Sequence, residues 1–275
     1  MIDFHCHSTF SDGLLTPEAL VGRAVEASIK MLALTDHDTT LGLASLRAAA
    51  LSSGLAIVNG IELSTRWKTH DIHVVGLQID PEHKTLQACI EAQTQSRNIR
   101  AIAMGHLLSP YVKDAYQKAR ALAGHERVSR PHFAEVLVKE GVVRDMATAF
   151  KRYLGRGRTA YVVTEWVSLP DVVRVIQESG GLAVLAHPLK YKLTRTKLNA
   201  LICAFKEAGG AGIEVISGLM TSTEINQIAT LCNDQGLLAS SGSDFHGDMV
   251  SRVALGRQAV LPDSCTPIWE QWGLH

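Results

Sequence analysis

Short apolar segments recur along the chain and alternate with longer segments whose apolar residues follow a helical period. Such segments, rich in branched side chains and bounded by polar or glycine positions, are typical of buried strands. The predicted strands are Ile2–His7, Met31–Thr35, Ala56–Asn59, Ile72–Gln78, Leu182–Ala186, Gly212–Ile216 and Leu237–Ser240. Strands that alternate with helices indicate an α/β architecture.

The segments between these strands carry helix signals. Thr16 is suited to cap a helix that has Pro17 in its first position, and Leu20, Val21, Ala24 and Val25 form its apolar stripe. The other predicted helices run from about Leu41 to Gly54, from Ser168 and Pro170 to Gly180-Gly181, and from Thr223 to Asp234.

Residues 82–160 break the alternation, because they contain helical segments and no convincing strand. The predicted helices there are Lys84–Leu108, Asp114–Ala123, Pro131–Glu140 and Asp145–Leu154. We therefore expect a barrel formed by residues 1–81 and 161–275, with residues 82–160 as a helical insertion that covers its mouth.

Composition places few limits on this fold. The chain has 275 residues, a formal net charge of zero and a hydrophobic fraction of 46%, which is ample for a core. A neutral chain has no overall attraction for nucleic acid or membranes, so local arginines and metals must hold any anionic ligand. We expect a cytoplasmic protein, because the sequence shows no signal peptide, no membrane-spanning run and five scattered cysteines without CxxC pairs.

Histidines and carboxylates gather where the predicted strands end. His5 and His7 point to the same side of a strand and can reach one ion, whereas Cys6 points away. The other candidates are Asp12, His37, Glu62, His187, Asp244 and His246, with His73 inside a strand. Imidazole and carboxylate together suit Zn, Mn or Fe, and close pairs of ions serve displacement at phosphorus.

These clusters also support a barrel. His5 and His7 end the first predicted strand, His37 follows the second, Glu62 the third and His187 the fifth. The carboxyl ends of parallel barrel strands share one rim, where catalytic groups gather. We therefore expect all these side chains to converge.

Three residues of the insertion are candidates for substrate contacts. Arg130 precedes Pro131 at a helix start, where anions are favoured, and Arg158 follows the glycine-rich segment Gly155–Gly157. Guanidinium groups in such places can hold phosphate through two hydrogen bonds. His132 is a candidate acid for a leaving oxygen.

The clusters resemble the motifs of the PHP (polymerase and histidinol phosphatase) family, in the family's order. The matching segments are His5-Cys6-His7-Ser8-Thr9-Phe10-Ser11-Asp12-Gly13, Thr35-Asp36-His37-Asp38, Gly60-Ile61-Glu62, Ala186-His187-Pro188 and Gly242-Ser243-Asp244-Phe245-His246. Within the family, Arg130-Pro131-His132, Tyr153-Leu154-Gly155-Arg156-Gly157 and the helical insertion resemble the bacterial nucleoside 3′,5′-bisphosphate phosphatases and a related 5′-to-3′ exoribonuclease.

The resemblance implies a distorted (β/α)7 barrel with a helical insertion and two or three divalent ions, commonly Mn²⁺, with Zn and Fe as alternatives. By motif position it makes nine residues metal ligands: His5, His7, Asp12, His37, Glu62, His73, His187, Asp244 and His246. In our hypothesis for the mechanism, Arg130 and Arg158 contact a second phosphate of the substrate, and His132 is a candidate catalytic acid.

The resulting hypothesis is an enzyme that hydrolyses the 3′-phosphate of nucleoside 3′,5′-bisphosphates, with short 5′-phosphorylated RNA as a further substrate. The expected binding partners are small nucleotides or short single-stranded RNA. We expect binding neither to membranes nor to duplex DNA. Two alternatives stay open. A histidinol-phosphate phosphatase shares the metal motifs but needs an acidic contact for an ammonium group. A non-catalytic metal-binding PHP module belongs to another functional class.

Overall fold

The computed structural model describes residues 1–272, which divide into two compact units. One unit contains residues 1–90 together with the chain from Val167 onward, and the other contains Glu91–Trp166. Each is described by itself. We call them the barrel unit and the insertion unit.

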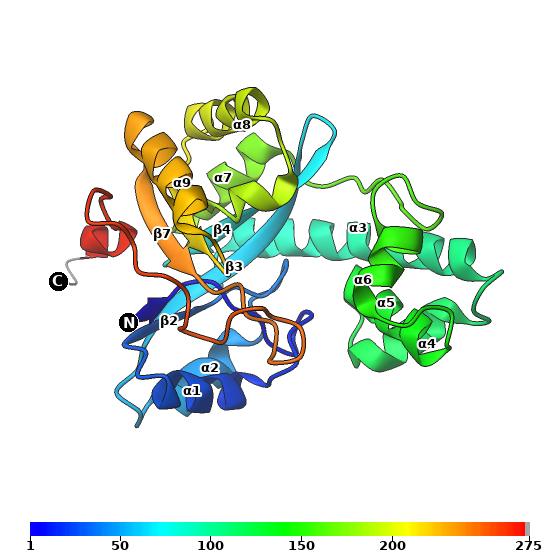
Figure 1. The fold of residues 1–275 in the computed structure, drawn as a ribbon. Coiled ribbons are helices and arrows are strands. Elements are labelled where there is room, and N and C mark those ends of the chain that lie inside the picture. Colours follow the sequence, from blue (N-terminus) through cyan, green and yellow to red (C-terminus); the bar gives the residue numbers. More distant parts are fainter. Residues whose placement is uncertain (273–275) are drawn as a thin grey trace. The chain divides into compact units, whose positions relative to one another are not determined.

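The strands of the barrel unit form one sheet in chain order, seven strands wide over the described residues. Their bounds are β1 Ile2–Asp3, β2 Met31–Leu34, β3 Ala56–Trp67, β4 His70–Leu77, β5 Leu182–Leu185, β6 Gly212–Ser217 and β7 Leu238–Gly242. The sheet is nearly closed into a barrel (Figure 1), because the N–H of Phe4 donates to the carbonyl of Ser241 at 3.0 Å. The predicted distorted seven-stranded barrel is confirmed.

The third and fourth strands depart from the predicted pattern. Instead of ending at Asn59, β3 continues to Trp67 and returns through a two-residue turn into β4, which runs antiparallel to both of its neighbours. The extension is stable because Gly60–Trp67 pair with β4 along their whole length. The prediction that Glu62 follows the end of a strand is therefore wrong, since Glu62 lies inside β3.

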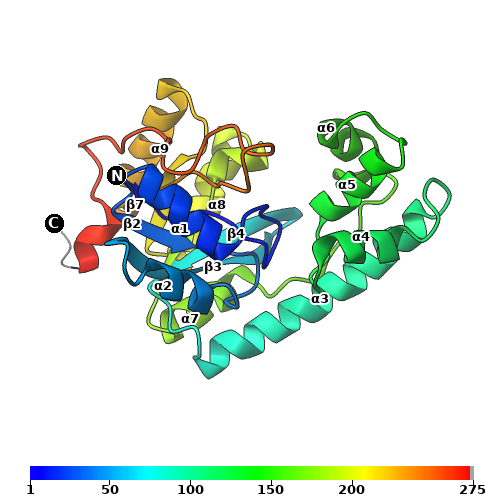
Figure 2. The same ribbon diagram turned by 90° about the horizontal axis from the view of Figure 1, so that it is seen from below.

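Helices surround the sheet of the barrel unit in two views (Figures 1 and 2). They are α1 Pro17–Glu26, α2 Leu43–Ala50, α7 Leu169–Glu178, α8 Arg195–Glu207 and α9 Ser222–Asp234, with short turns η2 Pro188–Tyr191 and η3 Ile268–Trp272. The predicted cap of α1 is confirmed, because the hydroxyl of Thr16 accepts the N–H of Ala19 at 3.3 Å. This hydrogen bond satisfies one of the free N–H groups at the helix start.

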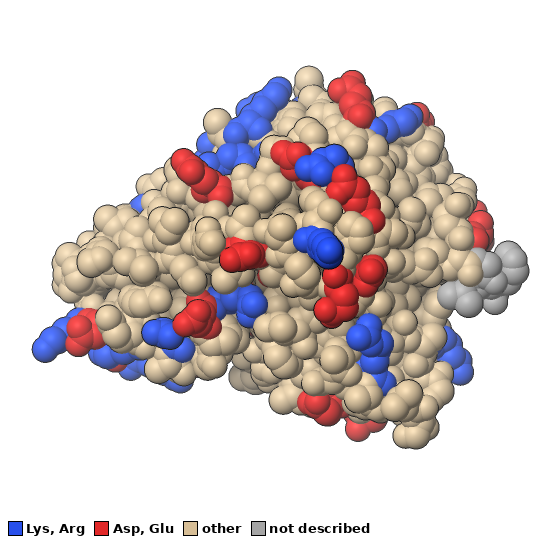
Figure 3. Space-filling model, turned by 180° about the vertical axis from the view of Figure 1, so that it is seen from behind, with Lys and Arg blue, Asp and Glu red and all other residues tan. Residues whose placement is uncertain are grey.

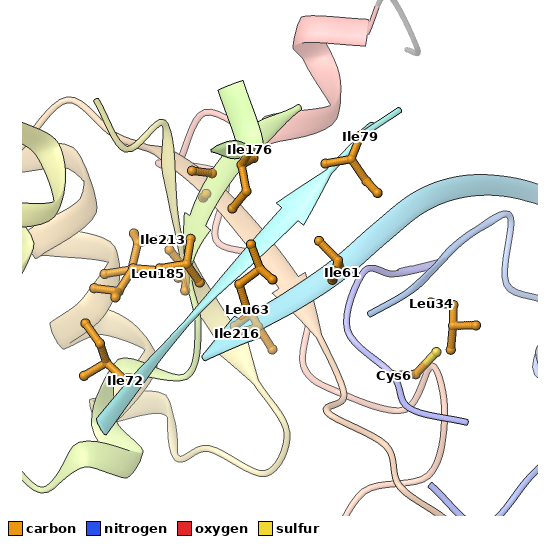
Figure 4. Close-up of a cluster of buried hydrophobic side chains, with 14 of the residues drawn as sticks. Cys6, Leu34, Ile61, Leu63, Ile72, Ile79, Ile176, Leu185, Ile213 and Ile216 are labelled. Carbon is orange, nitrogen blue, oxygen red and sulfur yellow. The ribbon is translucent and has the colours of Figure 1, made fainter. Parts of the chain in front are cut away.

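Successive side chains along each strand point to opposite faces of the sheet. In β4, Ile72 and Val74 pack in the core cluster beneath the surrounding helices, part of which Figure 4 shows, whereas Val75 and Leu77 belong to a second cluster with Phe4. Because side chains alternate along a strand, Glu62, His73 and Glu214 share the face of this second cluster, the inner face of the barrel. One end of the interior is therefore apolar and the other is available for polar groups.

The insertion unit is helical, as predicted. Helix α3 (Lys84–Leu108) enters it, and α4 Ala115–Ala123, α5 Arg130–Lys139, α6 Met146–Ala149 and η1 Phe150–Leu154 follow. Its own core is formed around Phe133, Leu137 and Leu154, which are fully buried. No helix among residues 1–272 is long and apolar enough to cross a membrane.

We predict that Gly242→Ala destabilises the barrel unit. A β-carbon at Gly242 would lie 2.3 Å from the Cβ of His5 and 2.9 Å from its backbone nitrogen, so β1 and β7 would have to separate. Overpacking of this kind costs about 1–3 kcal/mol, and thermal unfolding followed by circular dichroism measures it.

The matched control is Gly22→Ala in α1, where an added β-carbon meets nothing within 4 Å. This variant is expected to gain up to about 1 kcal/mol, because alanine favours the helix. A melting temperature of Gly242→Ala equal to that of the wild type would contradict the close contact between the strands.

Candidate metal centre

Loops and strands from all parts of the barrel unit carry the predicted ligands. Three follow β1, one follows β2, two lie in β3 and β4, one follows β5 and two follow β7: His5, His7, Asp12, His37, Glu62, His73, His187, Asp244 and His246. Backbone contacts fix the first and last segments, since Asp244 donates its N–H to the carbonyl of His5 at 2.8 Å and His7 donates to Phe245 at 2.8 Å. Segments at opposite ends of the chain therefore meet at one rim.

The nine side chains form four overlapping groups among the described residues, and the ligand atoms within a group lie within 4.8 Å of one another. The groups are His7, Asp12, His37 and His246; His5, His7 and Asp244; His5, Glu62 and His187; and His37, Glu62 and His73. The convergence expected from the sequence is thus present in the structure.

Glu62 lies at the centre of this arrangement. Its Oε1 lies 2.9 Å from Nδ1 of His73 and 2.9 Å from Nε2 of His187. Its Oε2 lies 2.9 Å from Nδ1 of His37 and 3.3 Å from Nε2 of His5. Both oxygens of this carboxylate thus face imidazole nitrogens, and Glu62 belongs to two of the four groups.

The distances between ligand atoms suit divalent metal ions. The Nε2 atoms of His5 and His7 lie 3.2 Å apart, and Oδ1 of Asp244 lies 3.3 Å from that of His7. Ligands that share an ion at about 2.1 Å lie about 3.0–3.4 Å from one another. Oδ1 of Asp12 and Oε2 of Glu62 are also buried, and the imidazole nitrogens near them do not lie in hydrogen-bonding geometry. Buried carboxylate oxygens need a hydrogen-bond partner or a cation.

Burial and neighbouring charges set the protonation of the cluster. Burial raises the pKa of Glu62, but His37, His73 and His5 outweigh it and hold that pKa well below its ordinary value. Burial and the neighbouring His246 lower the pKa of His7 to about 3. Glu62 is therefore ionised and His7 neutral, the forms that bind metal. For His246, burial lowers the pKa, but Asp12 and Asp244 outweigh it and raise that pKa to about 9.

Glu214 is a residue of the site that the sequence analysis missed. Its Oε1 accepts a hydrogen bond from Nδ1 of His5 at 2.5 Å, and its Oε2 accepts the backbone N–H of His187 at 2.7 Å. The first contact leaves Nε2 of His5 facing the cluster, as carboxylate partners of metal-binding histidines do. The second holds His187 where its backbone has a φ of 28°, which side chains disfavour. One signal was present in the sequence, because a lone carboxylate in the apolar segment Gly212–Ile216 requires a buried partner.

Asp36 has a supporting role in the loop that follows β1. Its carboxylate accepts the N–H of Ser8 at 2.7 Å and the hydroxyls of Ser8 and Ser11 at 2.6 Å each. These contacts fix the loop between His7 and Asp12, so that both reach the cluster.

The three candidate substrate residues lie in the insertion unit. Arg130 is the first residue of α5, and the exposed Arg158 closes a turn by donating its N–H to the carbonyl of Gly155 at 3.0 Å. His132 completes the cap of α5, because its Nδ1 accepts the N–H of Ser129 at 3.0 Å.

Comparisons with known proteins agree with the site. The family described as "PHP domain" matches residues 3–178. A 3′,5′-nucleoside bisphosphate phosphatase of Chromobacterium violaceum is 43% identical over 98% of this chain and 95% of its own length. The 5′-3′ exoribonuclease Rnm of Escherichia coli is 42% identical over 98% of this chain and 93% of its own. A solved structure of a Chromobacterium violaceum amidohydrolase, with bound sulfate and no metal, has a TM-score of 0.94 and 42% identity, covering 99% of this chain and 95% of that one.

We predict that Glu214→Gln weakens the binding of divalent metal about 10- to 100-fold. An amide keeps the size of the side chain but has one oxygen, which cannot accept from both His5 and His187. Titration of metal-free protein with Mn²⁺ measures the affinity. The control is Glu207→Gln on the exposed surface of α8, which makes the same chemical change. Equal affinities for the two variants would contradict a role for Glu214 in orienting the site.

Proposed function

Because the chain belongs to the PHP domain family, we propose that it is a metal-dependent phosphoesterase that removes the 3′-phosphate of nucleoside 3′,5′-bisphosphates. The observation that carries the proposal is the cluster of four overlapping ligand groups centred on Glu62. The high identity to a bisphosphate phosphatase over nearly the full length of both chains supports the substrate.

The nine clustered side chains hold two or three Mn²⁺ ions in this proposal, with Zn or Fe as alternatives. Bound divalent ions supply polarisation of phosphoryl oxygens and a water-derived nucleophile near neutral pH. Glu62 is shared by two of the ligand groups. Glu214 orients His5 and His187, and Asp36 fixes the loop between His7 and Asp12. Catalysis by such a site consists mainly of positioning and electrostatic stabilisation.

Arg130 and Arg158 bind the phosphate that is not cleaved. Arg130 lies at the start of α5, where backbone N–H groups favour an anion, and the side chain of Arg158 is exposed. A guanidinium group can grip a phosphate through two parallel hydrogen bonds. This second contact distinguishes a bisphosphate from a simple monophosphate.

His132 is the acid that protonates the leaving 3′-oxygen. Its Nδ1 accepts a backbone hydrogen bond, so in the neutral ring the proton resides on Nε2. An imidazole held in this tautomer is a competent hydrogen-bond donor. In this form Nε2 can donate a hydrogen bond to the leaving oxygen. Full proton transfer requires the imidazolium, in which Nδ1 also carries a proton and no longer accepts the N–H of Ser129.

Exonuclease activity on short 5′-phosphorylated RNA is the second candidate function, and the similarity to an exoribonuclease favours it. On the face that Figure 3 shows, lysine and arginine side chains are interspersed with aspartate and glutamate, and neither sign forms a continuous band. Duplex nucleic acid requires many phosphate contacts, which a broad basic surface supplies. The formal net charge of zero and the mixed charges on this face favour small nucleotides or a single 5′ end.

The substrate is tested by measuring kcat/KM of Mn²⁺-loaded protein for adenosine 3′,5′-bisphosphate, AMP, histidinol phosphate and a 5′-phosphorylated oligoribonucleotide. We expect adenosine 3′,5′-bisphosphate to be preferred over AMP and histidinol phosphate. A preference for histidinol phosphate would replace the proposed function, and no turnover of any of the four would favour a non-catalytic module.

We predict that purified protein carries more than one equivalent of divalent metal and that chelation abolishes its activity. His5→Ala should lower kcat/KM by more than about 100-fold, because an incomplete ligand set loses charge and geometry together. Elemental analysis and phosphate-release assays measure both effects. The control is His106→Ala on the exposed side of α3, and one equivalent or less in a fully active preparation would exclude a multinuclear site.

We predict that Arg130→Ala and Arg158→Ala reduce the preference for a 3′,5′-bisphosphate over a 3′-monophosphate. Loss of a charge-assisted contact worth about 1.5–3 kcal/mol lowers kcat/KM for the bisphosphate about 10- to 100-fold. Lysine at either position should restore only part of the loss. The control is Arg156→Ala in the same turn. Equal losses for both substrates would show that the arginines act on the cleaved phosphate instead.

A further inference from the structure

Lys190 lies close to the metal centre but is not one of the nine candidate ligands. It belongs to the turn η2, and its N–H donates to the carbonyl of His187 at 2.9 Å. The same turn is anchored by Tyr191, whose hydroxyl donates to the carbonyl of Ala186 at 2.8 Å and accepts the N–H of His73 at 2.9 Å. The backbone of Lys190 is thus fixed relative to β4 and β5.

The ammonium group of Lys190 contacts one oxygen of Asp244. That oxygen is Oδ2, whereas Oδ1 of the same carboxylate lies 3.3 Å from Nε2 of His7 and 3.5 Å from Nε2 of His5. Asp244 therefore presents one oxygen to the imidazoles of the cluster and the other to the lysine. The lysine therefore contacts one candidate ligand directly, and the carboxylate of that ligand lies between it and the imidazoles of His5 and His7.

Exposure distinguishes the two partners of this ion pair. The side chain of Asp244 is 6% exposed, while that of Lys190 is 53% exposed. Lys190 therefore reaches from solvent to the buried cluster. A half-exposed lysine that only neutralised a carboxylate would contribute little to stability, because water screens such pairs.

We propose that Lys190 binds the phosphoryl group that is to be cleaved. A phosphate held at the metal centre carries oxygens that the cluster does not contact, and an ammonium on a flexible stem beside Asp244 can reach them. Lysine is a common phosphate ligand because it supplies a compact positive charge without a fixed fork geometry. The inference rests on the metal-dependent phosphoester chemistry proposed above.

This role differs from that of the arginines of the insertion unit. Lys190 is part of the barrel unit and serves the phosphate at the metal centre, whereas Arg130 and Arg158 serve the phosphate that remains on the product.

The experiment measures the affinity of Mn²⁺-saturated, full-length protein for inorganic phosphate by isothermal titration calorimetry. Lys190→Met removes the charge and keeps the length of the side chain. We expect it to raise the dissociation constant of phosphate about tenfold, as for loss of one partly exposed charge-assisted hydrogen bond. Lys190→Arg should stay within about threefold of the wild type, since it keeps the charge. The control, Lys197→Met, removes an exposed lysine of α8 and should have no effect.

Metal content and turnover separate this role from a purely structural one. We expect Mn²⁺ content at saturation to be unchanged in Lys190→Met, and KM for adenosine 3′,5′-bisphosphate to rise. If the phosphate affinity at full Mn²⁺ loading stayed within twofold of the wild type, the ammonium would not contact phosphate and the proposal would be wrong. If phosphate binding depended on Lys190 but adenosine 3′,5′-bisphosphate were not hydrolysed, the proposed substrate would fail and the present inference would stand.

Discussion

The arrangement of polar groups inside the barrel depends on the contacts between the buried carboxylate of Glu62 and the surrounding histidines. This carboxylate is fully buried, and both of its oxygens lie within 2.9 Å of imidazole nitrogens. A charge removed from water in this way is tolerated only beside compensating groups or cations. Histidines from β4 and from the loops after β2 and β5 meet that requirement, so the interior of the barrel is polar at this end and apolar around Phe4 at the other.

Most of the site could be predicted from the sequence because its signals are local. His5 and His7 are two residues apart, and Asp244 and His246 have the same spacing. In the structure both pairs lie just after the ends of the neighbouring strands β1 and β7, which brings them to one rim. The strands themselves were visible as short apolar segments, and the structure contains a strand at each predicted place, although β1 ends at Asp3 and not at His7.

Two features could not be predicted in this way, because their causes lie elsewhere in the chain. The turn between β3 and β4 consists of Lys68 and Thr69, which lack the glycine, asparagine or aspartate typical of tight hairpins, although Lys68 adopts a φ of 53°. Glu214 resembles an isolated polar residue until its partner His5, 209 positions away, is in place. Contacts between residues distant in sequence determine the β3–β4 hairpin and the role of Glu214, whereas the helices of the insertion unit are defined by local signals.

The meeting of β1 and β7 also determines when the metal centre is assembled during synthesis. The chain supplies His5 and His7 almost at once, but their partners Asp244 and His246 emerge only after the whole insertion unit has been made. The insertion unit is one continuous segment with its own core, whereas the sheet cannot close until β7 arrives to pair with the first residues. Contacts this distant in sequence close slowly. Metal capture is therefore a late event in the maturation of the protein, and a truncated chain that lacks β7 retains His5 without the residues that complete its site.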